Sequence, residues 1–131
     1  MGGEDLEKLL AFIQPVMLAE QYVFCSVPDI RYGDLAELRP LASFQEDEGL
    51  SLVLEKSVAD AANLPYDSVF RGITLSVHSS LEAVGFTAAV SNKLAVNGIS
   101  ANVVAAHYHD HVFVPAAKAD LALQLLTEFE A

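Results

Sequence analysis

The sequence predicts an α+β fold made of antiparallel strands and a few short helices. The chain has 131 residues, enough for one ordinary domain or for two very small modules that share a core. Its hydrophobic share of 53% predicts a well-filled interior. Stretches with the alternating hydrophobicity of strands and stretches with helical periodicity follow one another, separated by glycines and prolines.

The first half of the chain predicts a loose series of helices and strands. The expected elements are a helix over 4–14, a strand over 21–27, a loop over 28–40, strands over 41–45 and 50–54, and a helix over 57–64. Leucines at helical spacing predict the first helix, which Pro15 should end. β-branched and aromatic residues predict the first strand. The next two strands flank an acidic turn, in which Gly49 should take a backbone conformation that other residues avoid.

The second half predicts a more regular series. The expected elements are a strand over 69–78, a helix over 84–97, strands over 100–107 and 111–114, and a last helix that starts at Pro115 and turns Ala116, Ala119, Leu123 and Leu126 inward. Strict alternation predicts the first strand, and Asn97-Gly98 should end the first helix. This order is a ferredoxin-like unit without its fourth strand, which should leave an open sheet edge for a second copy. The long strand 69–78 could serve both halves.

Charge and cysteine content narrow the choice of partners. The net charge of −11 disfavours nucleic acids and anionic membranes as partners. No apolar run approaches the roughly 20 residues that a membrane helix needs. A single cysteine, Cys25, cannot form an internal disulfide, which favours a cytoplasmic location.

The segment "HYHDHVFVP" (107–115) holds His107, His109 and His111 at alternate positions around Asp110. In an extended strand the three histidines would share one face. If the chain reverses at residues 108–110, His107 and His111 would form a cross-strand pair. Either arrangement offers a metal ion two nitrogen ligands, with Asp110 as a third. The other interpretation is a polar turn beside a strand end, and the sequence leaves both open.

The segment "HSSLEAVGF" (78–86) joins a predicted strand to a predicted helix. Ser79 and Glu82 have the spacing of a capping box. A helix start also offers free N–H groups to an anion, and Gly85 would let a ligand carboxylate approach the backbone. Glu82 could instead hold an ammonium group. The sequence has no nucleophile elbow, phosphate-binding loop or dinucleotide-binding motif, so it predicts neither catalysis nor a cofactor.

Two segments resemble known regulatory modules. Residues 79–126 resemble ACT-type modules through Gly85, the "NGIS" that follows the helix, the strand "ISANVVA" and the segment "DHVFVP". The likeness is closest to short bacterial ACT-like proteins of unassigned activity, and more distant to amino-acid sensors of the CASTOR type. The segment "FQEDEGLSLVL" (44–54) is similar to the companion module of those sensors.

The resemblance implies two ACT-like βαββαβ modules packed as a tandem pair, with antiparallel sheets and helices on one face. They would cover residues 1–67, in a degenerate form, and residues 68–131. The implied function is non-catalytic binding of a small molecule, an amino acid above all, in a homodimer or larger homo-oligomer. The implied ligand-binding residues are Ser79, Ser80, Glu82, Val84, Gly85 and Phe86, faced by Asn102, Val103 and Asp110.

The resemblance also assigns roles within this site. The N–H groups of Gly85 and Phe86 would take the ligand carboxylate, and Asp110 or Glu82 would pair with its ammonium group. Asn102 would add a side-chain hydrogen bond. The alternative function is a metal-binding protein or metal-dependent enzyme built on His107, His109 and His111.

Overall fold

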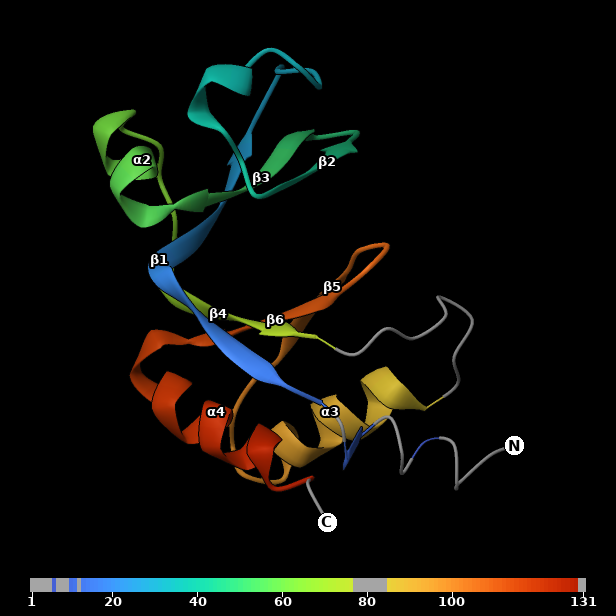
Figure 1. Ribbon diagram of the computed structural model, residues 1–131. Coiled ribbons are helices and arrows are strands. Elements are labelled where there is room, and N and C mark those ends of the chain that lie inside the picture. Colours follow the sequence, from blue (N-terminus) through green and yellow to red (C-terminus); the bar gives the residue numbers. More distant parts are fainter. Residues whose placement is uncertain (1–5, 7–9, 12, 77–84, 130–131) are drawn as a thin grey trace. The chain divides into compact units, whose positions relative to one another are not determined.

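The computed structural model describes residues 6, 10–11, 13–76 and 85–129 (Figure 1). The elements are β1 (Pro15–Val27), η1 (Ala36–Leu38), β2 (Ala42–Glu46), β3 (Gly49–Glu55), α2 (Lys56–Ala61), β4 (Phe70–Leu75), α3 (Phe86–Ala95), β5 (Asn102–Ala105), β6 (Asp110–Pro115), η2 (Ala116–Lys118) and α4 (Ala119–Thr127). Residues 6 and 10–11 have helical backbone, in agreement with the predicted first helix. The predicted α+β, ferredoxin-like fold is confirmed.

The chain forms two compact units. Unit 1 combines residues 1–19 with residues 71–131, and unit 2 consists of residues 20–70. Strand β1 begins in unit 1 and continues into unit 2. The predicted module boundary after residue 67 divides the chain by sequence, whereas these units divide it by spatial contacts.

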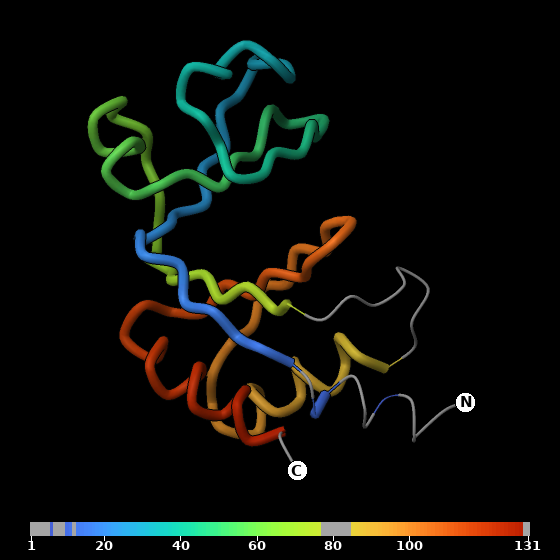
Figure 2. Tube along the Cα trace, viewed as in Figure 1, coloured from blue at the N-terminus to red at the C-terminus, as the bar shows by residue number. Residues whose placement is uncertain are grey.

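Unit 1 has the strand order β1–β4–β6–β5, with α3 and α4 on one side of the strands (Figure 1). The expected absence of a fourth strand is therefore wrong, because the first part of β1 lies beside β4. In Figure 2 the blue trace of β1 runs next to the yellow-green trace of β4. The Arg71 guanidinium joins the two strands by donating from Nη2 to the Leu18 carbonyl at 2.9 Å. The edge of β4 is thus covered within the chain itself.

The core of unit 1 lies between these strands and the two helices. Its buried side chains are Ile13, Ile73, Leu75, Phe86, Val90, Leu94, Ile99, Val112, Val114, Ala119, Ala122, Leu125 and Leu126. Of the predicted inward face of the last helix, Ala119 and Leu126 are buried and Leu123 packs against this core, whereas Ala116 precedes the α-helix and is only partly buried. Pro115 ends β6 and a 3-10 turn follows, so the α-helix starts at Ala119 and its buried positions follow that start.

Unit 2 has the strand order β2–β3–β1. Strands β1 and β3 pair from Tyr22↔Glu55 to Val27↔Leu50, and β2 pairs with β3 from Ala42↔Val53 to Glu46↔Gly49. The core side chains are Val23, Cys25, Leu50, Leu52, Leu54 and Ala59. The predicted role of Gly49 is confirmed by its φ of 151°. Between β1 and β2 this unit has only the three-residue η1.

No helix in the described part of the chain has both the length and the apolar character needed to cross a membrane.

Candidate functional site

The histidine segment forms the turn between β5 and β6. Ala105 pairs with Asp110, and the Ala106 N–H donates to the His109 carbonyl at 3.0 Å, so the chain reverses at His107 and Tyr108. Figure 2 shows this reversal at the tip of the orange hairpin. The predicted cross-strand pairing of His107 with His111 is wrong. The register places Val104 opposite His111, because the chain turns at His107 and Tyr108 and not at residues 108–110.

His111 lies within the sheet of unit 1 and is partly buried. Its Nδ1 lies 2.9 Å from the Thr74 hydroxyl on β4. The His109 ring lies on the same side of the chain, 6.5 Å away between ring centres. Burial lowers the pKa of His111 and the nearby His109 adds to this effect, while Asp110 opposes both. Among residues 6, 10–11, 13–76 and 85–129, no three metal-ligating side chains lie close enough together to hold an ion.

The lowered pKa predicts that acid destabilises unit 1 through His111. The unfolded chain takes up a proton as the pH falls through its ordinary value of 6.5, while the folded chain resists protonation. The free energy of unfolding should therefore fall as the pH goes from about 7 to about 5. The His111→Gln variant should show a shallower fall, measured by urea denaturation at a series of pH values.

The matched control for this prediction is His107→Gln, which changes an exposed histidine of the same turn. It should keep the pH dependence of the parent protein. Burial raises the pKa of Asp110, so that carboxyl contributes with the opposite sign, and only the difference between variants isolates His111. Equal slopes for the parent and for His111→Gln would contradict the prediction.

The hairpin separates two of the predicted ligand-binding residues. Val103 pairs with Val112, and both side chains point to the core of unit 1. Asp110 lies two residues before Val112 and hence on that same face. Asn102 lies on the opposite face, and its Nδ2 donates to the Phe113 carbonyl at 3.3 Å. The structure thus brings Asp110 and Val103 to one face of the hairpin and places Asn102 on the other.

Helix α3 begins immediately after Gly85. This glycine is the N-cap, with φ 92° in the left-handed region, and no side chain among the described residues caps the helix. Phe86 is the first helical residue, and its side chain is buried in the core of unit 1. A Cβ atom at position 85 would lie 3.2 Å from Cδ2 of Leu6, so the Leu6 side chain packs against this glycine. The first turn of α3 therefore presents backbone N–H groups without a side-chain cap.

The remaining predicted residues of this segment lie outside the described residues. They are Ser79, Ser80, Glu82 and Val84, together with His78. The capping box predicted at Ser79 and Glu82 therefore also lies outside the described residues.

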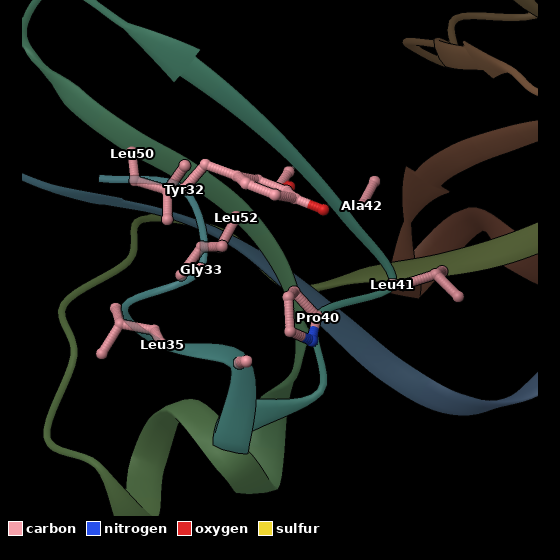
Figure 3. A pocket seen from close by; sticks show the side chains of 10 residues that line it. Tyr32, Gly33, Leu35, Pro40, Leu41, Ala42, Leu50 and Leu52 are labelled. Atoms are coloured by element: carbon pink, nitrogen blue, oxygen red, sulfur yellow. The ribbon is translucent and has the colours of Figure 1, made fainter. Parts of the chain in front are cut away.

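A cavity that the sequence did not indicate lies in unit 2 (Figure 3). Its volume is about 270 Å³, and its lining consists of Tyr32, Gly33, Leu35, Ala36, Pro40, Leu41, Ala42, Ser43, Leu50 and Leu52. The one available signal was the loop over 28–40, which carries Pro28, Gly33 and Pro40 where a βαββαβ module would have its first helix. A loop covers a sheet less completely than a helix does, which is how the cavity arises.

Comparison with known proteins gives matches over the whole chain. Two family models, each described as an ACT domain, match residues 1–71 and residues 68–128. A solved structure from Vibrio cholerae, described as a protein of unknown function and possible transport protein, is 50% identical. That similarity covers 100% of both chains, with a TM-score of 0.91. No curated protein matches the sequence.

More distant structures share the fold. A protein from Agrobacterium tumefaciens is 18% identical over 89% of this chain and 88% of its own, with a TM-score of 0.73. The ligand-free regulatory subunit of aspartate kinase from Thermus thermophilus is 12% identical over 93% of this chain and 99% of its own, with a TM-score of 0.66.

Proposed function

The chain belongs to the ACT domain family, and on that premise we propose that it binds a free amino acid and regulates a partner without catalysing a reaction itself. The family supports a ligand-binding regulatory module as the general function. The regulatory subunit of aspartate kinase is a different protein that shares the fold. The amino acid as ligand, and the residues that bind it, are the specific content of the proposal.

The observation that carries the proposal is the start of α3. Its first turn follows a left-handed glycine and has no side-chain cap from the part of the chain that the structure describes, so its N–H groups can serve an anion. The positive end of the helix dipole favours a carboxylate at the same place. We assign the ligand carboxylate to the N–H groups of Gly85 and Phe86. The segment that contains Ser79, Ser80, Glu82 and Val84 would complete this side of the site.

Asp110 is the proposed partner of the ligand ammonium group. Burial raises the pKa of this carboxyl, so its ionised form is poorly solvated and would be stabilised by a cation. Val103, on the same face of the hairpin, would contact the apolar part of the ligand. Glu82 is the other candidate for the ammonium group, and Asn102 could contribute only from the opposite face of the hairpin.

Isothermal titration calorimetry against the twenty amino acids tests the proposal. One or a few should bind the wild-type protein, and Asp110→Asn should weaken that binding at least about tenfold, because it removes a charge-assisted contact. Asp120→Asn is the matched control, since Asp120 is an exposed carboxylate on α4 in the same unit. It should leave the affinity unchanged.

Two results would contradict the proposal. One is the absence of heat from all twenty amino acids with protein shown to be folded. The other is equal weakening by Asp110→Asn and Asp120→Asn, which would indicate a general charge effect rather than a contact at Asp110.

We also propose that the chain acts as a homodimer or larger homo-oligomer in the cytoplasm. Among the described strands, β2 and β5 lie at the ends of the strand order, where backbone groups can pair with a second copy. Cys25 is a free, buried thiol, as suits a reducing compartment. Sedimentation velocity with and without the bound amino acid tests the oligomeric state, and a monomer under both conditions would rule it out.

A further inference from the structure

The cavity of unit 2 lies between the loop after β1 and the core face of β2 and β3. Leu50 and Leu52 on β3 are core side chains, and they form one wall. Leu35 and Pro40, from the loop on either side of η1, stand on the opposite side in Figure 3. The short η1 leaves this part of the sheet less covered than a full helix would. The cavity therefore belongs to unit 2 alone and is distinct from the site proposed at α3.

Tyr32 is held in place at the cavity by its backbone, while its side chain is left exposed. Its N–H donates to Gln45 Oε1 at 2.8 Å, and Gln45 Nε2 donates to the Ile30 carbonyl at 3.4 Å. These bonds attach the loop to β2. The Tyr32 side chain is nevertheless 79% exposed, and in Figure 3 its ring extends past Leu50 and Leu52 toward Ala42. An occupant of the cavity would cover one face of this ring and bury apolar surface that is now in water.

The lining determines the chemistry of the occupant. All ten lining residues are uncharged, and the polar side chains among them are the hydroxyls of Tyr32 and Ser43. A charged group placed here would lose hydration without gaining an ionic partner, which is costly. Aliphatic walls and one aromatic ring favour a flat apolar molecule, and a hydroxyl can satisfy one hydrogen-bonding group.

The volume of the cavity limits the size of its ligand. A cavity of roughly 150 Å³ holds one benzene ring. The cavity of about 270 Å³ in unit 2 accordingly has room for a fused pair of small rings. We propose that it is a second ligand site, specific for a small uncharged aromatic molecule with one hydrogen-bond donor and about the size of indole.

Titration with indole, followed by proton–nitrogen correlation spectra of the full chain, tests this site. Shifts are expected at the cavity residues of unit 2 and not at Gly85 or Asp110. Tyr32→Ala should weaken indole binding at least about tenfold, because it removes the aromatic face and leaves the backbone bond to Gln45 intact. Ala36→Leu, at an exposed lining position, should weaken it similarly by filling the space.

Three controls make the test specific. Tyr108→Ala removes another exposed tyrosine, which belongs to unit 1, and should leave indole binding unchanged. Indole-3-acetate, which carries a carboxylate, should not bind. Any amino acid found by calorimetry should bind without displacing indole, so failure of one site would leave the other proposal standing.

The site is disproved by an absence of indole shifts in the folded protein. It is equally disproved if indole binds Tyr32→Ala and Ala36→Leu as it binds the parent, or if its shifts centre on Gly85 and Asp110.

Discussion

Replacement of Gly49 by alanine is expected to destabilise unit 2 by about 3 kcal/mol or more. Gly49 has φ 151°, a conformation that residues with a side chain rarely adopt. A Cβ atom here would also collide with the Val27 carbonyl and would lie 2.8 Å from Cα of Pro28. Both are backbone atoms of β1 and the loop after it. They can yield only if the pairing of β1 with β3 opens at Val27↔Leu50.

Gly33→Ala is the matched control for this prediction. Gly33 also has a positive φ, 95°, but no atom lies within 4 Å of the position a Cβ would take. It should cost about 1 kcal/mol from backbone strain alone. Hydrogen exchange of the β1–β3 amides, read peptide by peptide, reports the stability of unit 2 separately. Equal losses in the two variants would show that the collision with β1 contributes nothing.

Replacement of Phe113 by alanine is expected to cost unit 1 about 3–5 kcal/mol. The Phe113 side chain is 1% exposed on β6, on the face away from Val112 and Val114. Its ring lies against β4, since a Cβ atom at Gly72 would be only 3.0 Å from Cε1 of the ring. Phe113→Ala would leave a cavity over Gly72 on this face of the sheet.

Two further variants test whether the loss of stability follows the buried volume that is removed. Phe113→Leu should cost clearly less, because it keeps most of the buried volume. Tyr108→Ala, at a side chain 67% exposed in the turn of the same hairpin, should change stability by no more than about 0.5 kcal/mol. Urea denaturation followed by exchange of the β4 and β6 amides measures all three. A loss as small for Phe113→Ala as for Tyr108→Ala would contradict the packing described for this face.

Local patterns predicted most of the elements because the information lies within each segment. The alternation of Ile73 and Leu75 places both in the core of unit 1, and β4 is the strand that it predicted. The acidic turn before Gly49 joins two paired strands, as expected from its residues. The last helix shows the limit of this reasoning, because a 3-10 turn follows Pro115 and the α-helix starts at Ala119 rather than at Pro115.

The candidate site was predictable only in part. Helix α3 begins directly after Gly85, close to the predicted start at residue 84, but the left-handed conformation of Gly85 was not predicted. The sequence could not predict whether the Asn102 and Asp110 side chains lie on the same face of the hairpin, because that depends on which residues form the turn. A reversal at His107 and Tyr108 puts these two side chains on opposite faces, and a turn shifted by one residue would have put both on the same face.

The sequence by itself determined the α+β class, the order of the strands and helices along the chain, and the likeness to ACT modules. Each of these follows from periodicity, turn residues or motifs within a short stretch. Only the tertiary structure decided that β1 supplies the fourth strand of unit 1, because that pairing joins residues 15–19 to a strand more than fifty positions later. It also decided the cavity beside Tyr32. A cavity depends on how completely a loop covers a distant sheet face, and no local pattern encodes that.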